Sequence, residues 1–243
     1  MQSSAFLIAV FEFVLLLFSL SFHECAHAWM ASRLGDQTAR LQGRITLNPA
    51  YHIDPVGTLL FPALIIFGPF IGFTFFSGFI VGWAKPTPVI TRNFRKIVRD
   101  DNLTTLAGPV SNLILVGIAF AVLAIISVAV SGGHSLVIST FVTILRFGTA
   151  LAVGVPSGLQ AIVILAVLAI EINLALFFFN LLPIPPLDGS RVLRNALPYK
   201  AVQQYDRINI WVSYLLMIVV GGFILGLLIR PAIALIFSAL LGV

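Results

Sequence analysis

The short stretch HECAH, residues 23–27, places two imidazoles and a carboxylate within about one helical turn. On an α-helix, residues four positions apart lie on the same face, so His23 and His27 can both be directed at one metal ion. Glu24 lies between them in sequence, where its carboxylate can reach a water molecule on that ion without binding the ion itself. This HExxH spacing is typical of zinc-dependent hydrolases.

The position of the motif strengthens this interpretation. A five-residue match is only moderate support by itself, but HECAH lies at the end of an apolar run from Ala5 to Met30. An ionisable group inside a membrane is costly unless it is paired or hydrated, so polar residues there indicate a function. The alternative, polar residues at a helix end that reach interfacial water, needs no metal and stays open at this point.

A catalytic zinc ion needs a third protein ligand and a fourth position open to water. The candidates are the remaining acids and histidines: Glu12, Asp36, His52, Asp54, Asp100, Asp101, His134, Glu171, Asp188 and Asp206. Asp188 differs from the others because it follows a long apolar segment broken by three prolines, and Gly189 after it permits a tight turn. A carboxylate on a broken helix at membrane depth must line a cavity or meet a partner, so Asp188 is the predicted third ligand.

The elements that must position these residues are membrane segments. Hydrophobic residues make up 59% of the 243 positions, charged residues only 9%, and the mean hydropathy is +1.07. These values exclude an ordinary soluble domain and predict an α-helical polytopic membrane protein with roughly four to six membrane segments. The net charge of +5 does not indicate a nucleic-acid partner, because the basic residues lie in short loops beside apolar runs, where they anchor helix ends.

No internal repeat or hydrophilic linker divides the chain, so a single membrane-embedded domain over residues 1–243 is predicted. Its expected parts are the HExxH helix (1–31), a β/loop element (39–56), a candidate re-entrant hairpin (57–83), a helix opening with LAGPVSN (103–130), a helix leading into the LDG motif (159–190) and a C-terminal helix (208–228). The first helix lacks a basic N-terminal region, so we expect it to be retained rather than removed as a signal peptide.

The β-element is predicted from alternation over residues 40–47, where polar side chains occupy the even positions and apolar or small ones the odd positions. A period of two is typical of a strand. We expect its open edge to hold a substrate segment whose backbone groups lose their helical partners on unwinding. The alternative is that the strand pairs only with the AKPTPVI stretch, residues 84–90, and covers the pocket.

Basic residues predict the topology, because they cluster in three loops, residues 32–56, 84–101 and 191–207. The positive-inside rule places all three loops in the cytoplasm, which requires residues 57–83 to enter and leave on one side and residues 136–156 not to cross completely. In the alternative, both segments cross and the second loop lies outside. Both schemes place HECAH and the LDG motif on the same side.

Three motifs in order, HECAH, LAGPVSN and NLLPIPPLDGSRVL, resemble those of the site-2 protease family, the intramembrane zinc metalloproteases of peptidase family M50. The motifs bracket residues 23–193. The resemblance implies one zinc ion per chain, with His23, His27 and Asp188 as its ligands and Glu24 as the general base.

The resemblance also implies a role for Asn180 near the substrate carbonyl, and for Asn112 as a substrate-region or structural asparagine. The sequence departs from many relatives in having no PDZ-like insertion, no CBS pair, and LDGS in place of LDGG. These departures concern substrate selection and regulation rather than chemistry. His52 and Asp54 are candidates for contacting the metal ligands from behind, although a loop histidine and a turn-forming aspartate are equally consistent with their context.

The predicted function is therefore an intramembrane zinc metalloprotease that hydrolyses single-span transmembrane proteins within or near the lipid bilayer. We expect a multi-pass protein of the cell membrane with its active site toward the cytoplasmic side. A transporter would normally have two similar halves, which this sequence lacks. An inactive metal-binding scaffold would have lost a catalytic-core residue, and all four are present. The substrate's identity and the formation of a homo-oligomer stay open.

Overall fold

The computed structural model describes residues 2–73, 83–147, 157–217 and 222–241, and this part of the chain is nearly all helical. The long helices are α1 (Gln2–Leu34), α4 (Ile97–Ala129) and α6 (Gly158–Asn180). The shorter helices are α2 (Thr38–Leu41), α3 (Phe61–Phe67), α5 (Gly133–Phe147), α7 (Asp188–Ala196), α8 (Tyr199–Tyr205), α9 (Ile210–Leu216) and α10 (Gly222–Leu241). Single 3-10 or π turns cover Pro49–Tyr51, Pro55–Leu60, Gly68–Ile71 and Thr91–Asn93.

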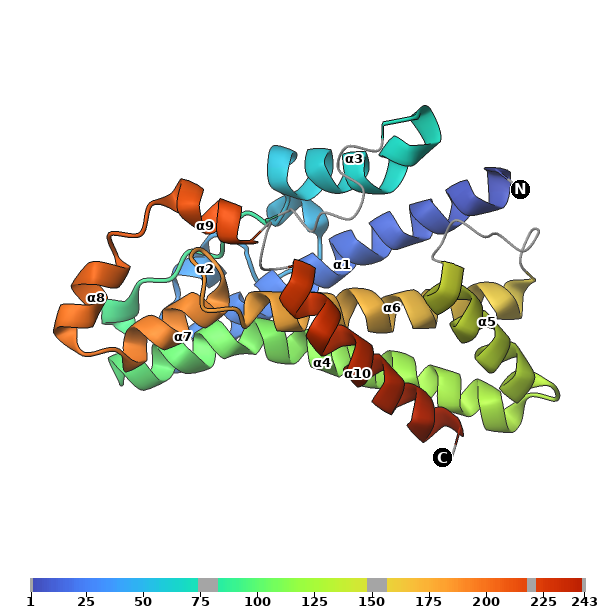
Figure 1. The fold of residues 1–243 in the computed structure, drawn as a ribbon. Helices are drawn as coiled ribbons and strands as arrows, with labels where there is room; N and C mark the ends of the chain where they lie inside the picture. Colours follow the sequence, from blue (N-terminus) through green and yellow to red (C-terminus); the bar gives the residue numbers. More distant parts are fainter. Residues whose placement is uncertain (1, 74–82, 148–156, 218–221, 242–243) are drawn as a thin grey trace.

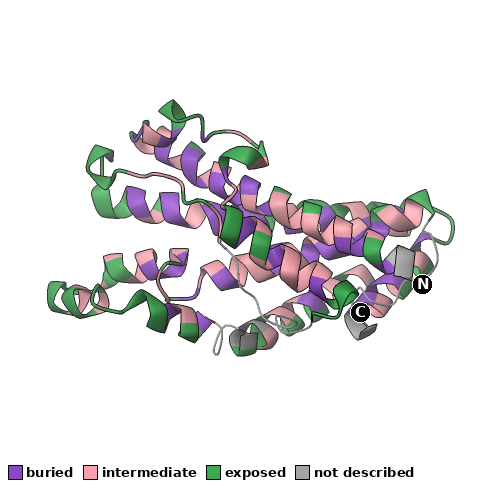
Figure 2. Cartoon of the chain, turned by 90° about the horizontal axis from the view of Figure 1, so that it is seen from above, coloured by how far each residue is buried: buried purple, intermediate pink, exposed green. Residues whose placement is uncertain are grey.

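The three long helices lie side by side and form the core of the molecule (Figure 1). Leu123 of α4 and Val163 and Val167 of α6 are completely buried where these helices meet. Figure 2 shows buried residues on the facing sides of the helices and more exposed ones outside. The outward face of α4 carries apolar side chains such as Ile125 and Val128, which are 65% and 89% exposed. Such exposure is expected where lipid rather than water is the solvent.

Among the described residues, three helices are long and apolar enough to cross a membrane: α1 from Ala5, α4 and α6. Several shorter apolar helices accompany them. The prediction of a helical membrane protein is thus confirmed in its coarser part, as a nearly all-helical chain with three long apolar helices and several shorter ones among the described residues.

The basic loops and the predicted site gather at one end of the bundle, where α1 and α6 end and α4 begins (Figure 1). Arg191 of α7 donates a hydrogen bond from Nη2 to Asp101 Oδ1 of α4, at 2.6 Å. Asn195 of α7 donates to Asp101 Oδ2 at 2.7 Å. These contacts fasten α7 to the start of α4, so the HECAH end of α1 and the LDG motif lie at the same end.

The segment predicted as a re-entrant hairpin returns to its starting point. Trp83 N–H donates to the Gly57 carbonyl at 3.1 Å, and the Thr58 hydroxyl donates to the Trp83 carbonyl at 2.7 Å. The two ends of residues 57–83 therefore meet, and the re-entrant path stays a prediction. Residues 74–82, which contain the later part of the predicted hairpin, lie outside the described residues.

The segment between α4 and α6 also begins and ends at one end of the bundle (Figure 1). Within it, α5 has 15 residues and is about 22 Å long, less than the roughly 30 Å of a bilayer's hydrocarbon core. The described part of the predicted segment 136–156 is thus too short to cross unaided, and residues 148–156 lie outside the described residues.

The prediction of a β-element after the first helix is wrong, because none of residues 39–56 forms a strand. The short helix α2 ends in a Schellman motif, in which Arg44 N–H donates to the Ala39 carbonyl at 2.9 Å and Gly43 N–H to the Arg40 carbonyl at 3.0 Å. Gly43 has a φ of +69°, a conformation that favours glycine. This glycine was the sequence signal for a helix end.

Burial explains why the alternating pattern was misleading. Arg44, a polar position of the pattern, is only 5% exposed and donates to the carbonyls of Tyr51 and Pro86. Leu41, an apolar position, is 85% exposed. A charged residue points inward and an apolar one outward, the reverse of an amphipathic strand beside water. The proposed substrate-holding strand edge therefore has no structural basis.

Two predicted helix boundaries also need correction. LAGPVSN lies inside α4 rather than at its start, because α4 already begins at Ile97 and Asp100 accepts the Lys96 N–H at 2.8 Å. A carboxylate in the first helical turn stabilises the helix N-terminus, so charged residues assigned to a loop form the first turn instead. The helix predicted over 159–190 ends at Asn180, and α7 begins separately at Asp188 because the three prolines interrupt helical hydrogen bonding.

The C-terminal helix was predicted over residues 208–228. Instead, α10 begins at Gly222 and continues through Pro231 to Leu241. A helix that borders lipid or packs on other helices tolerates an internal proline. Residues 218–221, between α9 and α10, lie outside the described residues.

Asp36 joins the loop after α1 to the residues that precede α4. Its Oδ1 accepts hydrogen bonds from Thr38 N–H at 3.1 Å and Asn93 Nδ2 at 2.8 Å, and its Oδ2 accepts the Ile90 N–H at 2.7 Å. Burial raises the pKa of the Asp36 carboxyl, but these hydrogen bonds outweigh burial and hold that pKa below its usual range.

Replacing Asp36 by Ala is expected to lower the free energy of unfolding by roughly 2–4 kcal/mol, because the donors from Thr38, Ile90 and Asn93 lose the buried carboxylate that accepts from them. Because the folded-state pKa is lowered, the stabilisation is complete above the unfolded-state pKa of about 3.9 and is lost as the pH falls through the folded-state pKa. Thermal unfolding in detergent at several pH values measures both effects. The control is Asp206→Ala, which removes an exposed carboxylate. Equal stability of native protein and Asp36→Ala at neutral pH would contradict this prediction.

Candidate metal centre

His23 and His27 project from consecutive turns of α1 toward one point. Their Nε2 atoms are 3.0 Å apart, and their ring planes are nearly perpendicular, at 84°. Both residues are buried, with 4% and 7% exposed. The helical spacing alone places them on one face, as the sequence predicted.

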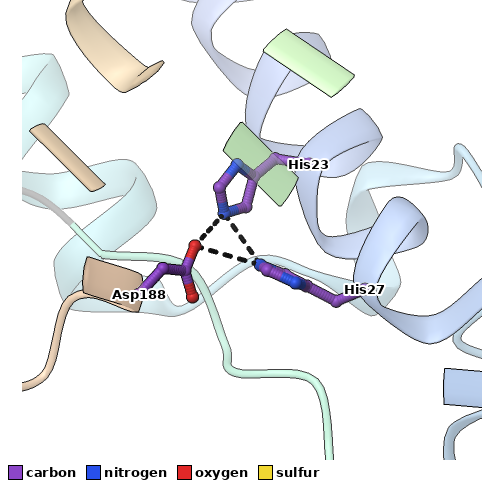
Figure 3. Close-up of side chains that lie close together, drawn as sticks. All are labelled: His23, His27 and Asp188. Carbon is purple, nitrogen blue, oxygen red and sulfur yellow. Dashed lines mark hydrogen bonds and ion pairs between the residues drawn. The ribbon is translucent and has the colours of Figure 1, made fainter. Parts of the chain in front are cut away.

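Asp188, the first residue of α7, faces the two imidazoles from the opposite side (Figure 3). Its Oδ2 lies 3.1 Å from His23 Nε2 and 3.3 Å from His27 Nε2. The next residue must be small, because a Cβ on Gly189 would collide with the Leu181 carbonyl oxygen.

The donor set fits a tetrahedral metal ion. The three ligand atoms form a triangle with sides of 3.0, 3.1 and 3.3 Å. Around a tetrahedral zinc ion with bonds of about 2.0–2.1 Å, neighbouring ligand atoms lie about 3.3 Å apart. Asp188 Oδ2 is buried, and no hydrogen bond of normal geometry reaches it from the part of the chain that the structure describes. A cation bound by the three ligand atoms would satisfy this oxygen.

Helix α4 fixes the proton on His27. The His27 Nδ1 atom lies 2.8 Å from the Thr104 carbonyl oxygen, which can only accept a hydrogen bond. Nδ1 therefore carries the proton, and Nε2 has a free lone pair directed at the other two ligand atoms. Such hydrogen bonds from behind orient metal-binding histidines.

Asn112 holds His23 in the same way. The side-chain amide of Asn112 lies 3.2 Å from His23 Nδ1, and its Oδ1 atom is buried without a partner among the described residues. The two amide atoms are not distinguished by shape, so a half-turn brings Oδ1 opposite Nδ1 and satisfies both groups. His23 Nδ1 then donates its proton, and Nε2 is free for a metal. Asn112 is completely buried and lies behind the imidazole rather than facing the cavity.

Gly108, within LAGPVSN, allows this close approach of α4. A Cβ at this position would collide with His27 Nε2 and would lie 2.6 Å from His23 Cε1. No larger residue fits without displacing an imidazole. The LAGPVSN motif therefore leaves room for the two imidazole rings at Gly108 and supplies a hydrogen-bond partner for His23 at Asn112.

Glu24 is held by a residue that the sequence did not single out. Residues 83–90, here called the strap, form no helix or strand and pass along the cavity. In the strap, Thr87 donates to Glu24 Oε2 from its N–H at 2.9 Å and from its hydroxyl at 2.7 Å. The hydroxyl also lies 3.0 Å from the Glu24 carbonyl oxygen. A threonine between two prolines was the only available sequence signal.

The three candidate ligands and Glu24 line a cavity of about 330 Å³, together with residues of the strap and of α9. Asn180, at the end of α6, also lines it and donates from Nδ2 to the Leu176 carbonyl at 2.9 Å. The second Nδ2 proton and the Oδ1 atom of Asn180 are left for other partners. The cavity thus combines a metal-binding triangle, a carboxylate and polar donors.

The structure does not bring His52 or Asp54 to the candidate ligands. The His52 Nε2 atom lies 2.9 Å from the Thr46 carbonyl oxygen, within the loop itself. Asp54 caps the turn Pro55–Leu60 by accepting the N–H groups of Val56 and Gly57. Neither residue lines the cavity. Both organise the loop after α1.

Known proteins resemble this chain over most of its length. A sequence model of peptidase family M50 matches residues 11–221. The chain is 38% identical over 185 residues to "Putative zinc metalloprotease YwhC" of Bacillus subtilis, a match that covers 76% of this chain and 68% of that protein. It is 29% identical over 177 residues to "Putative zinc metalloprotease Rip2" of Mycobacterium tuberculosis strain H37Rv, covering 73% of this chain and 53% of that protein. No solved structure matches the chain.

Proposed function

The chain belongs to peptidase family M50, and from that premise we propose how this intramembrane metalloprotease works: His23, His27 and Asp188 hold one zinc ion, and Glu24 is the general base. The observation that carries the proposal is the triangle of three buried ligand atoms, 3.0–3.3 Å apart, beside a separately held carboxylate. Three ligands leave the fourth tetrahedral position to water, as hydrolysis requires.

A zinc ion bound by these residues would act as a Lewis acid that polarises the scissile carbonyl and acidifies water. Glu24 accepts a proton from the attacking water and then donates a proton to the leaving amine. Thr104 and Asn112 keep the imidazole protons on Nδ1, so that both Nε2 atoms stay available. Asn180 donates a hydrogen bond to the oxygen that gains negative charge.

The substrate class we propose is a single-span transmembrane protein in the lipid bilayer. The site lies at one end of three membrane-length helices, inside a cavity rather than on an open surface. The basic loops at that same end favour a cytoplasmic orientation in the cell membrane under the positive-inside rule. No feature of the site, among the residues described, favours a nucleic-acid partner or transport.

Reconstitution tests this function. The purified protein is placed in lipid vesicles with candidate single-span substrates, and cleavage is followed before and after a chelator removes the metal. Cleavage that stops with the chelator and returns with added zinc supports the proposal. Metal-independent cleavage, or tight zinc binding without cleavage of any single-span protein, would contradict it.

Asn112 variants test how His23 is held. Asn112→Leu is expected to weaken zinc binding by about 10–100-fold, because His23 Nδ1 loses its partner. Asn112→Asp should bind zinc within about threefold of the native protein, because the accepting oxygen is retained. Competition with a zinc chelator measures both affinities. If Asn112→Asp impaired binding as much as Asn112→Leu, the amide nitrogen would be the atom that faces Nδ1.

A further inference from the structure

The strap is held by hydrogen bonds from several parts of the chain. Its backbone is tied to the rest of the protein from several directions: Lys85 N–H donates to the His52 carbonyl at 2.9 Å, and Arg44 Nη2 to the Pro86 carbonyl at 3.0 Å. Arg44 is a buried cation, 5% exposed. Together with Ile90 N–H on Asp36, at 2.7 Å, these bonds hold the middle and the end of the strap in one place.

Thr87 lies between these anchors and has its polar atoms directed at Glu24. The backbone N–H and the hydroxyl both donate to the same carboxylate oxygen, Oε2, at 2.9 and 2.7 Å. No hydrogen bond to Oε1 occurs in the described part of the chain, and Glu24 lines the cavity. One oxygen is thus occupied by the strap, and the other is left free.

We propose that Thr87 is a positioning residue that selects Glu24 Oε1 as the atom that exchanges protons with water and the leaving amine. This inference rests on the proposed role of Glu24. Two donors on Oε2 prevent the carboxylate from rotating about its terminal bond, so Oε1 keeps one direction. A carboxylate held by only one donor would lose part of that orientation, and a base misplaced by about 1 Å can lower the rate about 100-fold.

The two donors of Thr87 can be separated by substitution. Thr87→Val keeps the backbone N–H and nearly the same shape but removes the hydroxyl, whereas Thr87→Ser keeps the hydroxyl. Thr143→Val is the matched control, because it removes a hydroxyl that donates to the Ser139 carbonyl within α5, and Thr143 does not line the cavity.

Kinetics on a reconstituted single-span substrate provides the first test. Thr87→Val is expected to lower kcat roughly 10–100-fold with KM changed less than about twofold and zinc content unchanged, whereas Thr87→Ser and Thr143→Val keep kcat within about threefold. A native kcat in Thr87→Val would overturn the proposal. So would a Thr87→Ser variant as impaired as Thr87→Val, because the methyl group would then be the important part.

Thermal unfolding provides a test that does not depend on activity. Thr87→Val should lower the melting temperature by roughly 2–4 °C in the native background and by less in a Glu24→Ala background, since the carboxylate is absent there and the hydroxyl keeps only the Glu24 carbonyl as a partner. If the melting-temperature changes of Thr87→Val and Glu24→Ala simply added, the two residues would not be coupled. That result would overturn the proposal whether or not the chain cleaves a substrate. If instead the coupling is present but the native protein binds zinc and cleaves nothing, the proposed proteolytic function fails, and with it the role of Oε1.

Discussion

Glu24→Gln is expected to abolish proteolysis while zinc stays bound. Glutamine has the shape of glutamate and can still accept hydrogen bonds from Thr87, but its amide cannot take a proton from water. General-base catalysis contributes about 10²–10⁴-fold, so cleavage should fall at least a hundredfold. The proposed metal ligands His23, His27 and Asp188 are unchanged, so zinc content, measured by atomic absorption on the purified protein, should stay close to one ion per chain.

The matched control is Glu12→Gln, which changes the other glutamate of α1. Glu12 does not line the cavity, so cleavage should be nearly that of the native protein. The assay compares the three proteins in the same vesicles with the same single-span substrate. Native rates in Glu24→Gln would exclude Glu24 as the base, and loss of zinc from this variant would make it a ligand instead.

Asp188→Ala is expected to lose zinc and, as a consequence, proteolysis. It removes the only one of the three ligands that does not come from α1, and the two imidazoles that remain form an incomplete site. Zinc affinity should fall by more than the 10–100-fold typical of residues that only orient a ligand. Competition with a chelator measures the affinity, and cleavage should fall in parallel at fixed zinc concentration.

Asp206→Ala is the control for this change, because it removes an aspartate that is 44% exposed and pairs with Arg194 on the surface. Zinc binding and cleavage should be unchanged. Native zinc affinity in a folded Asp188→Ala protein would show that another residue is the third ligand. Thermal unfolding of Asp188→Ala shows whether a loss of zinc comes from the missing carboxylate or from loss of the fold.

Much of the ligand set could be predicted because it depends on local geometry. A spacing of four residues places His23 and His27 on one face of any α-helix, whatever packs around it. The apolar composition required membrane helices, and the prolines before Asp188 indicated a helix break where a carboxylate needs a partner. The sequence therefore determined the class of protein, the three candidate ligands and the candidate base.

The positions around these residues depend on contacts between distant parts of the chain, which no local pattern encodes. Asn112 meets His23 across 89 residues, and Thr87 meets Glu24 across 63. Gly108 is required only because α4 packs against two imidazoles.

The error in residues 40–47 has the same origin. Alternation predicts a strand only if one face meets water and the other the core, but here the buried position belongs to Arg44 and the exposed one to Leu41. Arg44 points inward because the carbonyls of Tyr51 and Pro86, the latter 42 residues away, need a donor there. The periodicity of one segment determined which side chains share a face, and only tertiary packing decided which face is buried and what each side chain contacts.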